Sequence, residues 1–197
     1  MADRKKAAVI VLAAGASTRL GRPKQLLPYR DTTLLAHAAG TALAARVGPV
    51  LVVLGHDSAA MRDALAGLDV ESVVNQSWAE GMGTSVRAGI AAIEKKWPGL
   101  RAVLLMTCDQ PLVPPGTLRE LVESVLTSTK RIAACAYGGS AGVPAAFARK
   151  FFPDLLKLSG DRGARVLILT RADDVRTFPC PEAAVDVDTE ADSAKLV

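Results

Sequence analysis

Short apolar runs alternate with longer amphipathic stretches along most of the chain. The runs are rich in Ala, Val, Leu and Ile, and they occupy residues 7–12, 50–54, 70–74, 102–106, 132–137 and 184–187. Several runs are continuous rather than alternating, which predicts strands that are buried on both faces of a sheet. The stretches between them predict helices over residues 32–46, 57–66, 84–96, 115–128 and 162–171. Pro115 suits the first turn of its helix, and Asp57 suits an N-cap position.

The order of these elements predicts the fold class. Strands that alternate with helices form right-handed βαβ units, so we predict an α/β fold with a mostly parallel central sheet. No internal repeat, low-complexity tract or linker interrupts the pattern, and we therefore predict one domain over residues 1–197. In open sheets of this kind ligands bind at the carboxyl ends of the strands, where the polar motifs of this sequence also fall.

Composition narrows the class of ligand. The chain has 24 basic and 20 acidic residues, a net charge of +4, and the charges are scattered. There is no long basic run and no aromatic series of the kind that binds nucleic acid, so we predict no nucleic-acid partner. No apolar stretch is long enough to span a bilayer, so we predict no membrane partner. A mildly basic protein suits an anionic small-molecule substrate.

The cysteines and the start of the chain bear on the compartment. Cys108, Cys135 and Cys180 are an odd set without a C-x-x-C pair, which argues against a disulfide scaffold or a zinc site and favours a reducing compartment. The first residues, RKKAAVIVLAAGAS, fit a secretory signal as well as a first strand followed by a glycine turn. This stretch alone leaves both alternatives open.

The segment LAAGASTRLGRPK, residues 12–24, directly follows the first predicted strand. Its glycines allow a ligand to approach the backbone closely, and Arg19, Arg22 and Lys24 can neutralise phosphate. The spacing matches neither G-x-x-x-x-G-K-[ST] nor G-x-G-x-x-G, so the two commonest nucleotide fingerprints are absent. A solvated surface turn is the alternative, but glycines and cations after a buried strand favour an anion site.

The pattern LAAG-x-S-x-R-x-G-x-x-K in this segment closely resembles the signature loop of the Rossmann-like nucleotidyltransferase superfamily, and within it that of the molybdopterin nucleotidyltransferases. Five further segments resemble motifs of that family in order: NQSWAEGMGTS (75–85), CDQP (108–111), GVPAAF (142–147), GDRGAR (160–165) and VDVDTEAD (185–192). Six ordered motifs are far more specific than any single one. The resemblance implies a single-domain, three-layer nucleotidyltransferase fold. It also identifies the first apolar run as a strand, so we expect a cytoplasmic protein.

Such enzymes join a nucleoside monophosphate to a substrate phosphate and release pyrophosphate. The resemblance implies that Arg19, Lys24 and Asp109 are catalytic: the cations stabilise charge on the triphosphate and the leaving pyrophosphate, and Asp109 binds Mg²⁺. A general base is unnecessary, because a phosphate oxygen with a second pKa of about 6 is already largely anionic. The only histidines are His37, which we assign to a helix, and His56, which we assign to a loop.

A second carboxylate ligand for Mg²⁺ is expected near the end of the chain. Asp186 and Asp188 lie two apart in a β-like run, so their side chains share a face and either can serve. The resemblance favours Asp188.

The resemblance also implies the two substrate pockets. The residues expected at the nucleotide are Leu12, Ala13, Ala14, Gly15, Ser17, Asn75, Gly81, Met82 and Ser85. Core packing is the alternative for Met82, whereas Asn75 can offer a donor and an acceptor to a base edge. The residues expected at the acceptor are Gly142, Pro144, Asp161 and Arg165. Without the family, the last two fit the start of a helix with a solvated arginine equally well.

One residue bears on the base. In this family the LAAG loop resembles that of cytidylyltransferases and LAGG that of guanylyltransferases, and the methyl group of Ala14 narrows the pocket. The leading hypothesis is therefore transfer of CMP from CTP, as co-substrate, to the molybdopterin cofactor, with delivery of the product to a molybdenum hydroxylase apoenzyme.

Two departures from the family pattern qualify the hypothesis. Glu190 stands where relatives have proline, and Ser140 and Ala141 stand where relatives often carry a basic residue, which puts one acceptor-phosphate contact in question. The alternatives are a relative that uses GTP or another acceptor, a non-catalytic cofactor carrier, and a dinucleotide-dependent oxidoreductase. The triphosphate and metal residues argue against the carrier, and the missing G-x-G-x-x-G argues against the oxidoreductase.

Overall fold

The computed structural model describes residues 6–17, 22–187 and 192. Its strands are β1 (Ala7–Ala13), β2 (Pro28–Tyr29), β3 (Thr32–Thr33), β4 (Val50–Leu54), β5 (Glu71–Val74), β6 (Ala102–Thr107), β7 (Ile132–Tyr137), β8 (Ser140–Ala148) and β9 (Val175–Pro179). Seven of them form the central sheet in the order β5-β4-β1-β6-β8-β7-β9. β8 pairs antiparallel with β6 and β7, and the other pairs in this sheet are parallel. The predicted α/β fold with a mostly parallel sheet is confirmed.

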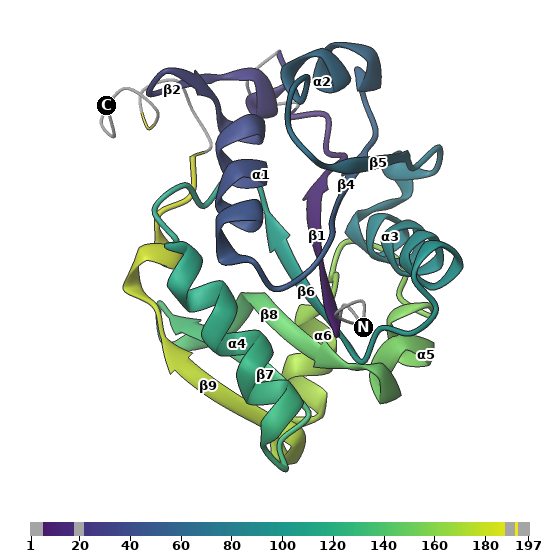
Figure 1. Ribbon diagram of the computed structural model, residues 1–197, viewed down its shortest axis with the longest axis vertical. Helices are drawn as coiled ribbons and strands as arrows, with labels where there is room; N and C mark the ends of the chain where they lie inside the picture. The colour runs from purple at the N-terminus through teal and green to yellow at the C-terminus, as the bar shows by residue number, and fades with distance from the viewer. Residues whose placement is uncertain (1–5, 18–21, 188–191, 193–197) are drawn as a thin grey trace, which may run out of the picture.

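Helices cover both faces of the sheet (Figure 1). One face packs against α1 (Leu34–Ala45), α2 (Ser58–Ala64) and α4 (Pro115–Thr127), and the other against α3 (Met82–Lys96), α5 (Phe152–Leu155) and α6 (Arg165–Thr170). Successive side chains of β1 alternate between these two cores: Val9 and Val11 enter the first, whereas Ile10 and Leu12 enter the second. Burial on both faces explains why this strand is apolar at every position, and it gives the three layers expected.

Most of the predicted elements are present. The strands predicted over 50–54 and 132–137 have the same bounds in the structure, and all five predicted helices occur with ends that differ by at most three residues. The strand predicted over 184–187 is wrong. Residues Pro181–Ala184 form a 3₁₀ turn, and the described residues that follow it, 185–187, pair with none of the described strands.

The carboxyl ends of β1, β4 and β6 meet at one edge of the sheet. Leu12 pairs with Thr107 and Ala13 pairs with Leu54, so the loops that follow these strands are neighbours. Within the described ranges, none of the helices combines the length and apolar character needed to cross a membrane.

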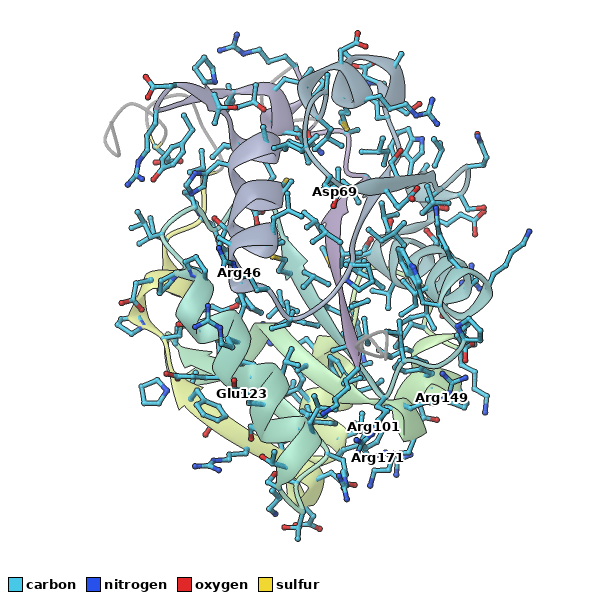
Figure 2. All side chains as sticks on the ribbon, in the orientation of Figure 1. Arg46, Asp69, Arg101, Glu123, Arg149 and Arg171 are labelled. Atoms are coloured by element: carbon cyan, nitrogen blue, oxygen red, sulfur yellow. The ribbon has the colours of Figure 1, made fainter. Side chains whose placement is uncertain are left out.

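An arginine cluster lies at the opposite end of the sheet. Figure 2 shows Arg101, Arg149 and Arg171 near the beginning of β6, away from the carboxyl ends of the parallel strands. Arg149 donates from Nη1 to two backbone carbonyls, both at 2.9 Å, and pairs with Glu94 at 3.2 Å. Arg171 pairs with Asp154 at 3.4 Å. Arg149 and Arg171 therefore stabilise the end of the sheet at which the parallel strands begin. Other residues must bind a substrate at the end where these strands finish.

Candidate active site

A buried amide holds the loop that follows β1. Gln25 is only 1% exposed. Its Nε2 donates to the carbonyl oxygens of Ala13 at 3.0 Å and Gly15 at 2.7 Å. A second tie comes from Ser17, whose Oγ accepts the backbone N–H of Lys24 at 3.0 Å. Ser17 itself adopts a left-handed conformation with φ of 51°. The two arms of the loop are thus fastened together, and Gly15 remains exposed at the end of β1.

Lys24 and Asp109 meet at this loop. The distance from Lys24 Nζ to Asp109 Oδ2 is 2.6 Å, and the two side chains are 21% and 19% exposed. Lys24 begins the 3₁₀ helix Lys24–Leu26, whereas Asp109 follows β6, so the fold brings two predicted catalytic residues together from distant segments. Arg19, the third predicted catalytic residue, lies outside the described residues.

The backbone around Asp109 is held from two sides. Its carbonyl oxygen accepts the N–H of Val187 at 2.9 Å, which brings the end of the chain to the site. Two residues further on, the carbonyl oxygen of Pro111 lies 2.9 Å from His37 Nε2. His37 belongs to α1 and packs edge-on against Tyr29, with 4.6 Å between ring centroids. His37 therefore positions the loop that carries Asp109.

The thiol that precedes Asp109 is not a nucleophile. Burial, followed by the charge of the Asp109 carboxylate, raises the pKa of Cys108 to about 12. A thiol with so high a pKa stays protonated at neutral pH, and the thiolate is the reactive form. The chemistry of this site therefore falls to charged and polar groups.

Asn75 is buried, and both ends of its amide are engaged. Nδ2 donates to Thr84 Oγ1 at 2.8 Å and to Ser85 Oγ at 3.0 Å, and Oδ1 accepts the N–H of Ser77 at 3.0 Å. The amide joins the end of β5 to the beginning of α3, with both of its N–H groups used. Contact with a base stays a prediction, through the remaining acceptor capacity of Oδ1. Ser85 is also buried and supports this corner.

Gly81 marks a close contact between two predicted motifs. Its φ is 109°, and a Cβ at this position would lie 2.4 Å from the carbonyl carbon of Gly160 and 2.6 Å from Asp161 Oδ1. The N–H of Gly83 donates to the carbonyl oxygen of Gly160 at 2.8 Å. Only glycine fits position 81, because both the conformation and the space exclude a side chain. The predicted nucleotide segment 75–85 and acceptor segment 160–165 therefore converge.

A cavity of about 350 Å³ opens beside this contact. It is lined by apolar and polar residues from the ends of β1, β6 and β7, from β8, and from the beginnings of α3 and α6 with the segment before α6: Leu12, Met82, Thr107, Tyr137, Gly138, Ser140, Ala141, Gly142, Val143, Asp161, Arg162, Ala164 and Arg165. Gly142, Asp161 and Arg165, three of the predicted acceptor residues, line it, whereas Pro144 is buried in β8. Met82 is 43% exposed and faces this cavity, which favours a ligand contact over core packing.

Tyr137 is a cavity residue that the sequence reading missed. Its hydroxyl donates to the carbonyl oxygen of Val143 at 2.8 Å and accepts from Gln110 Nε2 at 3.3 Å. A Cβ at Gly142 would lie 2.7 Å from the Tyr137 hydroxyl oxygen, so the glycine there leaves room for the phenol. Burial raises the pKa of Tyr137, which keeps the phenol neutral. Tyr137 thereby links the neighbour of Asp109 to the cavity wall.

Carboxylates for a metal ion are few. Among the described residues, no group of three or more His, Cys, Asp or Glu side chains is arranged to bind a metal. Asp186 is exposed and directly precedes Val187, which bonds to Asp109, whereas Asp188 lies outside the described residues. The expectation that these two acids share a strand face is wrong in its premise, because residues 184–187 form no strand. Asp109 is the carboxylate that the structure brings to the loop.

Comparison with known proteins places the chain among nucleotide-using enzymes. Residues 9–175 match the family described as the MobA-like NTP transferase domain. The chain is 36% identical to nicotine blue oxidoreductase of Paenarthrobacter nicotinovorans over 200 residues, which covers 95% of both proteins.

Solved structures agree with the family match. Rv0371c from Mycobacterium tuberculosis H37Rv superposes with a TM-score of 0.81 and 34% identity, over 97% of this chain and 96% of that one. A second structure of Rv0371c is a complex with manganese, with a TM-score of 0.79. A nucleotidyl transferase from Methanothermobacter thermautotroptrophicus, Mth528, superposes with a TM-score of 0.80 and 27% identity, over 96% and 95% of the two chains.

Proposed function

This chain belongs to the MobA-like NTP transferase family, and we propose that it transfers the CMP unit of CTP to the phosphate of the molybdopterin cofactor. An acceptor phosphate oxygen forms a bond to the α-phosphorus of CTP. The bond from that phosphorus to the oxygen bridging to the β-phosphate breaks, and pyrophosphate leaves with both electrons. No redox partner is required. The observation that carries the proposal is the contact of Lys24 with Asp109 at the loop after β1.

The residues of the loop supply charge and position. In phosphoryl and nucleotidyl transfer the enzyme mainly positions the reactants and stabilises charge. Lys24 Nζ supplies a positive charge beside Asp109, and phosphate can approach the exposed backbone of Gly15 closely. Gln25 holds Ala13 and Gly15 in place before substrate arrives, so these two residues need no reorganisation at the moment of reaction.

Asp109 suits a divalent cation. Mg²⁺ usually binds through one or two carboxylates together with substrate phosphates and water, so a single well-placed carboxylate fits. Asp109 would hold the ion, with Asp186 or Asp188 as a further carboxylate. Bound there, the ion would neutralise charge on the triphosphate and the leaving group. The manganese complex of Rv0371c supports a divalent cation in this family. In this structure Lys24 donates to the carboxylate of Asp109. When metal and nucleotide bind, Lys24 must therefore either release this carboxylate or contact it together with the metal ion.

The cavity beside Gly142 suits the acceptor. Ser140 stands where relatives often carry a basic residue. In this chain Arg165, from another segment, donates from Nη2 to Ser140 Oγ at 2.8 Å and brings a positive charge to the same place. This arginine offers the phosphate contact that the sequence pattern left in question. Apolar walls from Leu12, Met82 and Val143 suit the ring system of the cofactor. Leu12 and Met82 were expected at the nucleotide, and this proposal assigns them to the acceptor side instead. Delivery of the product to a molybdenum hydroxylase apoenzyme is part of the same proposal.

The test is pyrophosphate release from CTP and from GTP, with molybdopterin cofactor and Mg²⁺ present. We expect release with CTP in preference to GTP, and loss of release in Asp109→Asn. Asp63→Asn is the matched control, because Asp63 is an exposed acid on α2, outside the site. Equal loss in both variants overturns the assignment of Asp109, whereas release with neither nucleotide despite tight cofactor binding overturns the transferase in favour of a carrier.

A second candidate function is a reductase reaction. The observation that favours it is the 36% identity over 95% of the chain to a protein named nicotine blue oxidoreductase. The loop after β1 lacks the G-x-G-x-x-G spacing that dinucleotide-binding loops use. Oxidation of a reduced nicotinamide cofactor, measured with and without nicotine blue, distinguishes the two. Dye-dependent oxidation that survives Asp109→Asn would support the reductase.

A further inference from the structure

Two aromatic side chains meet at the carboxyl end of β4, beside the loop after β1. The rings of His56 and Trp78 have centroids 5.2 Å apart and an interplanar angle of 57°. The backbone N–H of His56 donates to the carbonyl oxygen of Ala14 at 3.4 Å. An aromatic pair that no catalytic step above uses is thus attached to the nucleotide loop.

Gly55 brings this pair into contact with Ala14. A Cβ at residue 55 would lie 2.4 Å from the carbonyl oxygen of Ala14 and 2.8 Å from the Cβ atoms of both Ala14 and Trp78. Ala14 is only 5% exposed and belongs to the same core, against which Trp78 packs. The methyl group of Ala14 is therefore covered. Its effect on a base must be transmitted through Trp78 and His56.

The pair is rigidly mounted and still accessible. Trp78 begins the 3₁₀ turn Trp78–Glu80, and its carbonyl oxygen accepts the N–H of Gly81 at 3.2 Å. The preceding residue, Ser77, is fixed by Asn75 on one side and by Thr84 on the other, whose hydroxyl donates to the Ser77 carbonyl at 2.9 Å. The side chain of His56 is 45% exposed, and Trp78 is half-buried. Aromatic rings that are held in place and remain partly exposed are what a nucleic base stacks on.

The position of the pair assigns it to the nucleoside rather than to the acceptor. β4 and β6 lie on opposite sides of β1 in the sheet. The cavity with Arg165 is on the β6 and β8 side, and the His56–Trp78 pair is on the β4 side. If the acceptor occupies the cavity, the open surface on the other side of the loop is left for the nucleoside.

We propose that the base of the nucleotide stacks on the His56–Trp78 pair, and that the imidazole of His56 limits the size of base accepted. This inference rests on the proposed nucleotidyl transfer and adds to it the residues that select the base. Ala14 then acts as a positioning residue, because it sets where Trp78 lies.

The chain contains two tryptophans, which allows a direct test by fluorescence. In Trp97→Phe the remaining emission comes from Trp78, and we expect Mg–CTP to quench it with the same midpoint as calorimetric binding. Trp78→Phe keeps Trp97, which follows the far end of α3, and its emission should not respond to Mg–CTP. Calorimetric binding of CTP without any change in Trp78 emission overturns the inference and leaves the transferase intact. Binding and quenching without turnover overturns the transferase alone, and no binding overturns both.

Base size is tested separately with His56→Ala. We expect the ratio of kcat/KM for GTP to that for CTP to rise about tenfold, within the range of one base–aromatic contact. His56→Phe restores a ring of similar size and should return the ratio close to that of the unmodified protein. An unchanged ratio in His56→Ala, with normal folding by circular dichroism, rules out His56 as the size limit.

Discussion

Replacing Gln25 with glutamate tests whether one buried amide holds the loop after β1. The two side chains have nearly the same shape, but the substitution replaces Nε2, which donates to the carbonyl oxygens of Ala13 and Gly15, with an oxygen. At neutral pH the introduced carboxylate would face two carbonyl oxygens at a residue that is 1% exposed. The variant loses two hydrogen bonds and gains a buried charge, for which the Ser17 hydroxyl, 3.4 Å from Gln25 Oε1 in the unmodified protein, remains a donor.

The structure sets the size of the effect. Leaving the buried carbonyl oxygen of Ala13 without its donor costs about 1–3 kcal/mol, and a buried charge costs more, so together they lower the free energy of unfolding by about 2–6 kcal/mol. Protonation of the introduced carboxyl restores one donor, so its pKa in the folded protein rises above the unfolded value of about 4.3. Stability from a raised pKa is present at low pH and lost as pH rises. We therefore expect Tm to fall by about 5–15 °C at about pH 7.5 and by less at about pH 5.

Thermal unfolding followed by circular dichroism measures this shift, and calorimetric titration with Mg–CTP measures the binding function of the loop. Gln76→Glu is the matched control, because Gln76 is exposed and the same substitution there should stay within about 0.5 kcal/mol of the unmodified protein. We expect CTP affinity to fall in Gln25→Glu. Equal stability of the two variants at both pH values would show that the amide of Gln25 does not hold the loop.

Three further outcomes are expected. Gly81→Ala should lower the free energy of unfolding in urea by about 2 kcal/mol more than Gly67→Ala. Both glycines have positive φ, but a Cβ at Gly81 would lie 2.4 Å from the backbone of Gly160, whereas a Cβ at Gly67 has open space; equal losses would show that the backbone at Gly160 moves aside. His37→Ala should lower kcat about tenfold with little change in Tm, since it removes the contact to the loop of Asp109; unchanged kcat would mean that this contact does not position the acid. The free energy of unfolding should decrease as pH rises from about 9 toward 12, because burial raises the pKa of Cys108 to about 12 and the unfolded chain then binds fewer protons. Cys108→Ala should flatten that decrease, and an identical pH profile would contradict the assignment.

The central part of the fold could be predicted because burial on both faces leaves a direct trace in sequence. β1, β4, β6 and β7 are continuous apolar runs since helices cover the sheet on both faces. β9 was missed because it is an edge strand with exposed residues such as Arg176 and Thr177, so it needs no apolar continuity. β8 was missed because Gly142 and Pro144 interrupt its pattern. The run at 184–187 alternates like a strand, but none of the described strands pairs with it.

The site was predictable only in part. Position after a strand, together with the family motifs, indicated Lys24 and Asp109, and the structure brings them to 2.6 Å. The role of Gln25 left no trace, because an amide that bonds two carbonyls of a distant strand end has no local pattern. The approach of Gly81 to Gly160 is likewise a tertiary contact that spacing does not encode.

We propose that this edge of the sheet performs nucleotidyl transfer, with the loop tied by Gln25 and the carboxylate of Asp109. CTP labelled at the α-phosphate and CTP labelled at the γ-phosphate can each be followed through the reaction with molybdopterin cofactor and a divalent cation. We expect the α-label to move to the acceptor, the γ-label to leave in pyrophosphate in equal amount, and Asp109→Asn to stop both. Both labels remaining on CTP, while a reduced nicotinamide cofactor is oxidised in the presence of nicotine blue, would rule out nucleotidyl transfer.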